Sequence, residues 1–407
     1  MAEEMRVVLR NYGKIDPLKI EDYINAGGYQ ALEKARSMSQ TDVIEEVRKS
    51  GLRGRGGAGF NAGQKWNFAF QAQADQKYVI CNADEGEPGT YKDRTIMQGD
   101  PHSVLEGMAI CGYAIGASKG YIYCRGEYPY VVDLLNQAID QAREKGVLGD
   151  FDIEVRMGAG AYVCGEETAL IESIEGHRGE PRFKPPYPPV SGLWGKPTIV
   201  NNVETLASVP VILEKGGDWY AGLGAASYPG TKVLTLTGDV VNKTVIEVPT
   251  NTTICEVIYD FGGGIAGGKA FKAVQIGGTS GAFIPESLLD TQIDFDSMSA
   301  AGASLGSGAV LVMDETRDIV DVVCRIAKFF EHESCGKCAP CREGTMRLHK
   351  LMNKLNAGEG SAADIALLNK LGRVMSVACL CGLGQAAPSP VLTTIKHFQP
   401  DYNAKLQ

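Results

Sequence analysis

A short cysteine-rich segment near the C-terminus limits the possible structures of this chain more than any other feature. It reads Cys335-Gly-Lys-Cys338-Ala-Pro-Cys341, and Cys379 and Cys381 follow it downstream. Thiolates are the preferred ligands of iron-sulfur clusters, and three thiolates at this spacing can reach three irons of one cubane. Structural zinc sites usually present two separated pairs, so the triplet favours a [4Fe-4S] cluster. From spacing alone, Cys381 and Cys379 are both candidates for the fourth ligand.

Disulfides and free thiols account less well for the cysteines than a cluster does. The chain has 11 cysteines, an odd number, and no signal peptide is recognisable, which argues against a disulfide framework. Free thiols would place three reactive groups in a turn that contains Gly and Pro, with no gain in packing. His332 is close enough in sequence to compete as a ligand, but a single histidine is more often a surface residue.

The composition is that of a folded, soluble protein. A length of 407 residues suggests about two or three domains. The 40 Lys and Arg residues against 49 Asp and Glu residues give a net charge of -9, so the basic surface of a nucleic-acid-binding protein is missing. No run of about 18 apolar residues is present. We expect a cytoplasmic protein with no nucleic-acid partner and no direct insertion into a membrane.

Glycines are the second unusual feature, since 50 of them occur and many are clustered. The segment Gly51-Leu-Arg-Gly-Arg-Gly-Gly-Ala-Gly-Phe60 has the G-x-G-x-x-G spacing at Gly54, Gly56 and Gly59. A helix rather than a strand is predicted before it, so an ordinary Rossmann fingerprint is not expected. Three cations lie in or near the segment: Arg53, Arg55 and Lys65. The loop is suited to a phosphate, although a tight turn with solvated arginines is the alternative.

Predicted strands at residues 77–81, 120–124 and 151–156 alternate with predicted helices at residues 104–115 and 130–144. This order indicates an open α/β sheet, in which ligands bind at the carboxyl ends of the strands. Beyond residue 230, short strands and one helix predict a small α+β module. From Asp318 onward the apolar spacing is helical, which predicts a C-terminal bundle around the cysteines.

Acidic residues gather where two of these strands end. Asp84, Glu85 and Glu87 follow one strand, and Glu166 and Glu167 follow another. They can bind ribose hydroxyls, hold a metal ion or act as acid and base, while a solvated acidic loop is the alternative. No Walker A or G-x-S-x-G sequence is present. The residues together indicate a redox protein with a nucleotide and an iron-sulfur cluster, or otherwise a phosphate-binding metal enzyme.

Five ordered segments resemble the NADH-binding 51 kDa flavoprotein of respiratory complex I. They are Gly51–Phe60, Cys81-Asn-Ala-Asp-Glu-Gly-Glu-Pro-Gly89, Gly158-Ala-Gly-Ala-Tyr-Val-Cys-Gly-Glu-Glu-Thr168, Val200-Asn-Asn-Val-Glu-Thr205 and Glu333-Ser-Cys-Gly-Lys-Cys-Ala-Pro-Cys-Arg-Glu-Gly344. Related subunits occur in NAD-linked hydrogenases and formate dehydrogenases. Residues 7–16 and 381–390 look most like the beta subunit of NAD-dependent, electron-bifurcating [FeFe]-hydrogenases of anaerobes.

The resemblance implies a multidomain α/β protein. Its parts are an N-terminal helical segment with the glycine-rich loop (residues 1–65), a Rossmann-like FMN/NADH-binding domain (66–228), a ubiquitin-like α+β domain of the SLBB type (229–312) and a helical bundle that binds [4Fe-4S] (313–407). Many such subunits carry an N-terminal thioredoxin-like [2Fe-2S] domain and a C-terminal ferredoxin domain. We expect neither in this chain.

The resemblance also implies the binding residues. FMN is expected to contact Gly54, Arg55, Gly56, Lys65, Asn82, Asp84, Glu85, Tyr162, Gly165, Glu166, Asn201, Asn202 and Thr205. NAD(H) is expected to contact Phe60, Phe68, Glu87, Glu167 and Lys184. The cluster ligands would be Cys335, Cys338, Cys341 and Cys381, the last by its match to the family's C-x-L-G string. Cys379 would then be the spare thiol.

The implied reaction is hydride transfer between NAD(H) and FMN, followed by one-electron transfer to the cluster. Glu166 and Glu167 are the catalytic candidates, with roles in binding and electrostatic tuning. The expected partners are a thioredoxin-like [2Fe-2S] subunit and a catalytic hydrogenase subunit. Complex I or a formate dehydrogenase is the alternative setting, and a non-catalytic docking subunit is the alternative class. Because Glu87 and Glu167 would repel a 2′-phosphate, we expect NADH rather than NADPH.

Overall fold

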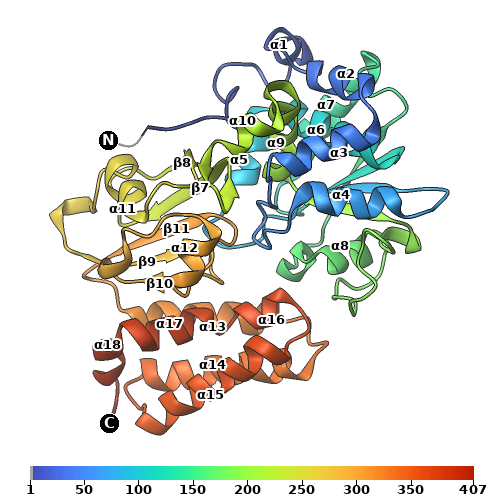
Figure 1. The fold of residues 1–407 in the computed structure, drawn as a ribbon. Helices are drawn as coiled ribbons and strands as arrows, with labels where there is room; N and C mark the ends of the chain where they lie inside the picture. The colour runs from blue at the N-terminus through green and yellow to red at the C-terminus, as the bar shows by residue number, and fades with distance from the viewer. Residues whose placement is uncertain (1–2) are drawn as a thin grey trace.

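The computed structural model describes residues 3–407 (Figure 1). Its first part is built on a four-stranded parallel sheet with the strand order β3-β2-β1-β4. The strands are β1 (Tyr78–Ala83), β2 (Lys119–Cys124), β3 (Asp152–Met157) and β4 (Thr198–Asn202). The three strands predicted for this region are therefore confirmed as β1, β2 and β3, with small differences at their ends.

Helices surround this sheet and supply the N-terminal region. They are α1 (Ile20–Asn25), α2 (Gln30–Ser37), α3 (Gln40–Lys49), α4 (Ala62–Gln71), α5 (Lys92–Gly99), α6 (Pro101–Ile115), α7 (Pro129–Glu144), α8 (Glu167–Ile174), α9 (Val203–Lys215) and α10 (Gly217–Ala221). α6 is buried on nearly all sides, where it contacts β1, β2 and α9, because most of its residues are apolar and its polar Glu106 and His102 bond with Tyr23 and Tyr29. The helices predicted at residues 104–115 and 130–144 are confirmed as α6 and α7. As predicted, the glycine loop follows a helix, α3.

A second, mixed sheet has the strand order β10-β9-β11-β7-β8. After two short strands, β5 (Gly224–Ala225) and β6 (Tyr228–Pro229), it contains β7 (Thr231–Gly238), β8 (Thr244–Pro249), β9 (Phe271–Ile276), β10 (Ala282–Ile284) and β11 (Ala309–Asp314). β7 and β8 form an antiparallel hairpin, and β11 pairs in parallel with β7. The helices α11 (Ile254–Glu256) and α12 (Phe295–Ala300) complete this part. The small α+β module predicted beyond residue 230 is thus present.

The C-terminal part is a helical bundle that lies below the second sheet in Figure 1. Its helices are α13 (Ile319–Glu333), α14 (Ala339–Asn356), α15 (Ala362–Ala378), α16 (Gly382–Ala386), α17 (Ser389–His397) and α18 (Gln399–Asn403). One hydrophobic cluster extends from Tyr123 and Ile171 in the first part to Phe330 and Met375 in the bundle. The bundle therefore shares a core with the first part. Over residues 3–407, no helix combines the length and hydrophobicity needed to cross a membrane.

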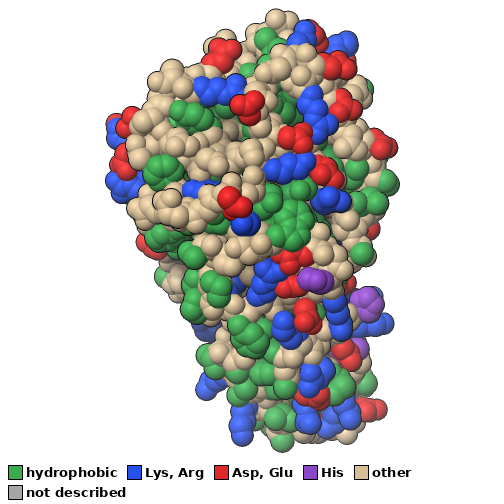
Figure 2. Space-filling model, turned by 90° about the vertical axis from the view of Figure 1, so that its right-hand side faces the viewer, with side chains coloured by type: hydrophobic (Ala, Val, Ile, Leu, Met, Phe, Trp, Pro, Cys, Tyr) green, Lys and Arg blue, Asp and Glu red, His purple; other side chains and the backbone are tan. Residues whose placement is uncertain are grey.

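The surface carries charges of both signs. On the face shown in Figure 2, acidic and basic side chains are interspersed from the first part at the top to the bundle at the bottom. This mixture agrees with the net charge of -9. Nucleic-acid-binding proteins instead gather basic side chains on one face, so this face does not have the character of a nucleic-acid interface.

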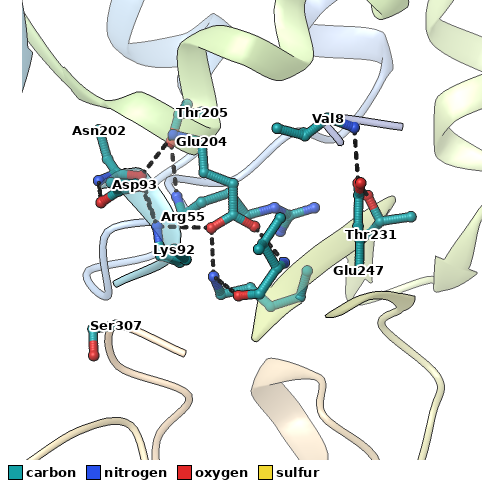
Figure 3. A network of polar contacts seen from close by, with 12 residues as sticks. Val8, Arg55, Lys92, Asp93, Asn202, Glu204, Thr205, Thr231, Glu247 and Ser307 are labelled. Atoms are coloured by element: carbon teal, nitrogen blue, oxygen red, sulfur yellow. Dashed lines mark hydrogen bonds and ion pairs between the residues drawn. The ribbon is translucent and has the colours of Figure 1, made fainter. Parts of the chain in front are cut away.

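A buried network of charges joins the two sheets (Figure 3). Glu204 at the start of α9 forms ion pairs with Lys92 at 2.9 Å and with Lys232 of β7 at 2.5 Å, and each of these side chains is at most 1% exposed. Burial alone would raise the pKa of Glu204, but Lys232, Lys92 and Arg55 lower it to about 2. The carboxylate is therefore charged. Since buried charges need partners, this network holds the second sheet against α5 and α9.

A second buried carboxylate anchors the N-terminal segment. Glu247 of β8 accepts hydrogen bonds from the backbone N–H groups of Val7, Val8 and Leu9 at 3.0, 2.9 and 2.8 Å. The Thr231 hydroxyl donates to the same carboxylate (Figure 3). The segment before α1 is thus tied to a strand more than 200 positions away in sequence.

His102 of α6 leads to a prediction about pH. Its side chain is buried, its Nδ1 lies 2.9 Å from the Tyr29 hydroxyl oxygen, and burial lowers its pKa from 6.5 to about 4. Between these two pH values the unfolded chain binds the proton more readily than the folded chain, so acidification removes up to ~3 kcal/mol of stability. We expect His102→Gln to flatten this part of the stability profile, measured by urea unfolding from pH 7 to pH 4. An unchanged slope would contradict the assignment.

Candidate functional site

The three parts of the chain meet around a cavity of about 380 Å³. Its walls come from the glycine loop, the residues after β1, the end of β4, the residues before α8, two loops of the second sheet and α16 of the bundle. The cavity therefore lies at the carboxyl ends of parallel strands, which is where α/β sheets bind ligands. A ligand in it would touch both the first sheet and the bundle.

The structure brings together many of the residues expected to bind cofactors. Those that line the cavity are Gly56, Asn82, Asp84, Glu85, Glu87, Tyr162, Gly165, Glu166 and Asn202. Those that do not line it are Gly54, Arg55, Phe60, Lys65, Phe68, Glu167, Lys184, Asn201 and Thr205. Gly57 and Ala58 of the predicted glycine loop line the cavity as well. The sequence does not point to several further lining residues: Lys92, Asp93, Ser280, Ser304, Gly306, Ser307, Leu383 and Ala386. The one local signal for any of them is the cation shortly after the acidic loop, at Lys92.

Some expected FMN contacts lie beneath the glycine loop. The Arg55 guanidinium is fully buried, and its central carbon lies 4.0 Å from the ring centre of Tyr228. The backbone N–H of Arg55 donates to the Thr205 hydroxyl at 2.8 Å, and the Trp66 indole N–H donates to the Asn201 side-chain oxygen at 2.9 Å. These side chains hold the glycine loop and α4 in place from below.

Asp84 offers the cavity a group that the protein itself leaves unused. Its Oδ2 is buried and has no hydrogen-bond partner among residues 3–407. Burial raises the pKa of Asp84 to about 7, so the carboxyl can accept or donate near neutral pH. The N–H and C=O groups along the edge of a flavin ring can bind such a carboxyl.

The glycine loop approaches the cavity wall closely at Gly56. A methyl group at Gly56 would lie 3.0 Å from the Asn202 β-carbon, a tight contact that the glycine avoids. Lys92 also lines the cavity, and its ammonium lies 3.2 Å from the Asn202 side-chain oxygen and is paired with Asp93 and Glu204. A bare loop backbone suits a phosphate. Together with Asp84, these residues fit FMN.

Two lysines and two glutamates form a network beside the cavity. The Lys65 ammonium lies 2.8 Å from Glu167, and the Lys184 ammonium lies 2.7 Å from Glu166 and 3.3 Å from Glu167. Burial alone would raise the pKa of Glu167, but Lys65 and Lys184 together lower it. Glu167 is therefore ionised at neutral pH. The network places carboxylates and cations where ribose and phosphate groups can be bound.

Two aromatic rings are exposed near this network. Phe60 is 53% exposed and Phe68 is 43% exposed, and their ring centres lie 6.4 Å apart. Phe68 and Lys65 are both on α4. Rings in this position contribute little to the core but can stack on a flat heterocycle. The loop before β4 adds further exposed rings, at Phe183 and Tyr187.

Glu87 connects the loop after β1 to the second sheet. Its Oε1 accepts hydrogen bonds from the Ser280 backbone N–H at 2.8 Å and from the Ser280 hydroxyl at 2.6 Å. Burial raises the pKa of Glu87. Both side chains line the cavity, so the second sheet helps to position a carboxylate in the wall.

The cysteines of the bundle lie at helix ends. Cys335 and Cys338 are in the turn before α14, Cys341 is in the first turn of α14, and Cys381 directly precedes α16. Within residues 3–407, no three cysteines bring their sulfurs within 4.8 Å of one another. The four expected ligands therefore lie at the start of α14 and at the start of α16. Four thiolates are the donor set that a [4Fe-4S] cluster takes.

Family models match two regions of the chain, and relatives match nearly all of it. The Nuo51 FMN-binding domain matches residues 47–211, and the NADH-ubiquinone oxidoreductase-F iron-sulfur binding region matches residues 321–405. The NADP-reducing hydrogenase subunit HndC of Solidesulfovibrio fructosivorans is 50% identical over 99% of this chain and 84% of its own. The F subunit of the NADH-quinone oxidoreductase of Aquifex aeolicus is 46% identical over 98% of this chain and 94% of its own.

A solved structure has the same fold. The NAD⁺-reducing [NiFe]-hydrogenase in the H₂-reduced state matches with a TM-score of 0.86 and 38% identity over 93% of this chain, which spans 65% of that hydrogenase chain. The expected cofactors FMN, NAD(H) and [4Fe-4S] are confirmed, as is the expected role in electron input within a multisubunit complex. The chain belongs to the family of NADH-quinone oxidoreductase F subunits, which are flavin- and iron-sulfur-dependent oxidoreductases.

Proposed function

We propose that this family member is the NADH-oxidising subunit of a cytoplasmic NAD-dependent hydrogenase of the [FeFe] type. The proposal rests on the composition of the cavity wall. Residues suited to FMN and residues at the start of α16 line the same cavity. Cys381 directly precedes Gly382, which is part of that wall, so a flavin and a cluster would be close neighbours. The relative HndC, a hydrogenase subunit, supports the hydrogenase setting.

The proposal assigns partners and domains as well. The partners are a thioredoxin-like [2Fe-2S] subunit and a catalytic hydrogenase subunit, working in an anaerobic and electron-bifurcating complex. The four-stranded sheet is the core of a Rossmann-like domain, and the five-stranded sheet is the core of a ubiquitin-like domain of the SLBB type. An input subunit of complex I is the second candidate, favoured by relatives such as the Aquifex aeolicus protein.

Hydride acceptance and the release of single electrons are the chemistry that FMN supplies when bound, since the protein's side chains lack it. Asp84 and Asn82 would orient the flavin ring, and the bare backbone at Gly56 would hold its phosphate. Phe60 and Phe68 would stack on the dinucleotide. We assign the cluster to Cys335, Cys338, Cys341 and Cys381.

The role of Glu167 can be tested by nucleotide preference. Lys65 and Lys184 keep this carboxylate charged, so it would repel the 2′-phosphate of NADPH. We expect Glu167→Gln to shift the ratio of kcat/KM for NADPH and NADH towards NADPH by about tenfold, equivalent to about 1.4 kcal/mol. The matched control is Glu144→Gln, on the exposed end of α7. An unchanged ratio of kcat/KM for NADPH and NADH would show that Glu167 does not discriminate against the 2′-phosphate on the ribose.

The function itself is tested by an anaerobic visible spectrum of the full chain after reconstitution with FMN, iron and sulfide. We expect flavin bands that bleach on addition of NADH, together with broad iron-sulfur absorbance. A folded, colourless protein that ignores NADH and NADPH would overturn the proposal and favour a non-catalytic docking role. Flavin without iron-sulfur absorbance would overturn the cluster assignment alone.

A further inference from the structure

We propose that Ser334 and Cys379 are positioning residues that donate hydrogen bonds to the Cys341 sulfur and thereby raise the reduction potential of the cluster. The inference rests on the proposed role of Cys341 as a cluster ligand. It gives a function to Cys379, which is not one of the four assigned ligands. It also explains why five cysteines lie between residues 335 and 381 for a four-thiolate cluster.

The first donor is the hydroxyl of Ser334, the residue directly after α13. Its Oγ lies 3.3 Å from the Cys341 sulfur. The same oxygen accepts a hydrogen bond from the backbone N–H of Gly336 at 3.3 Å. A ligating Cys341 thiolate carries no hydrogen, so the Ser334 hydroxyl is the donor in this pair. Gly336 has a φ of +77°, a conformation that glycine adopts readily and that forms this turn.

The second donor is the thiol of Cys379, at the end of α15. Cys379 and Cys341 are each only 5% exposed, and their side chains are within hydrogen-bonding reach of each other. Both pack against α16, since a methyl group at Gly384 would lie 2.8 Å from the Cys379 sulfur and 3.0 Å from the Cys341 β-carbon. The absence of a side chain at Gly384 therefore lets α16 hold the two cysteines together.

Cys379 is assigned as a donor because Cys381, which begins the C-x-L-G string, is the proposed fourth ligand. Closeness to Cys341 does not by itself set the two roles apart, since Cys338, a proposed ligand, is also within hydrogen-bonding reach of Cys341. Cys381 lies on the half-buried side of the turn.

Hydrogen bonds to a ligating sulfur withdraw negative charge from the cluster and so favour its reduced form. Two donors on the Cys341 sulfur should make the midpoint potential more positive than that of a cluster without them. The cluster would then accept electrons from the flavin more readily. Removing either donor should shift the midpoint to more negative values, and removing both should shift it further.

The test is an EPR-monitored redox titration of the reconstituted full chain, with iron content measured alongside. We expect Cys379→Ala and Ser334→Ala to keep the wild-type iron content and to show more negative midpoints, with a larger shift in the double variant. Cys379→Ser keeps a donor and should restore most of the midpoint. The matched control is Cys324→Ala, because Cys324 is a buried bundle cysteine whose thiol bonds Asn353 instead.

Unchanged midpoints in both single variants would overturn the inference. Loss of the cluster in Cys379→Ala and Cys379→Ser, with retention in Cys381→Ala, would also overturn it by making Cys379 the ligand. If Cys379→Ala fails to fold, Ser334→Ala and Cys379→Ser still decide the question. Failure of the proposed function is distinguishable, because a chain without any bound cluster gives no EPR signal in the wild type.

Discussion

Replacing Cys338 with alanine should remove the EPR signal of the cluster while NADH still bleaches the flavin. Cys338 lies in the turn before α14, whereas among residues 3–407 the bundle contributes only residues of α16 to the FMN cavity. Losing one of four thiolates should therefore empty the cluster site and leave the flavin site intact. Electron transfer to the partner subunits should fall to background. The measurements are iron content, EPR after dithionite reduction, and flavin bleaching in the same sample.

The control for this experiment is Cys255→Ala, which changes a partly exposed cysteine of the second sheet's helix α11. It should retain iron, EPR signal and flavin. Full iron content in Cys338→Ala would show that the triplet is not the ligand set. Loss of flavin together with iron would show that the bundle is needed to form the cavity.

The second large effect is expected from Glu204→Ala. The variant would leave Lys92 and Lys232 buried without their shared carboxylate, and unpaired buried charges typically cost 3–5 kcal/mol, so we expect a loss of about 3–5 kcal/mol in unfolding free energy. Because Lys92 also lines the cavity, FMN affinity should fall as well. Urea unfolding and FMN titration measure the two effects.

Glu214→Ala, on the exposed side of the same helix α9, serves as the control and should change stability by less than about 0.5 kcal/mol. A similarly small effect for Glu204→Ala would mean that the lysines find water or different partners. Glu204→Gln should fall between the two, since it keeps hydrogen-bonding atoms but loses the charge.

Local sequence patterns predict most of the helices and strands, because secondary structure depends mainly on neighbouring residues. The alternation of strands and helices from β1 to β3 follows apolar periodicity, and the structure confirms it within a few residues. The sequence also predicts a helix before the glycine loop, and α3 precedes it. The cavity lies at the strand ends, where the sheet type predicts a ligand.

The direction of individual side chains is harder to predict. Arg55 sits in the glycine loop and carries a charge suited to phosphate, yet its guanidinium packs on Tyr228 beneath the loop. Phe60 and Phe68 could equally have been core residues, but both are exposed. The local sequence around each residue is compatible with either a buried or an exposed side chain. Only packing against residues far away in the sequence decides which of the two occurs.

By itself, the sequence determined the element order, the cysteine triplet and the membership of a redox family, because spacing and motif are local properties of the chain. The tertiary structure decided that Ser280 and Ser307 of the second sheet and Leu383 of the bundle complete the cavity. It also decided that Cys379 lies against Cys341. These contacts join residues far apart in the chain, and their free energy comes from burial and charge pairing that exist only when the three parts have packed together.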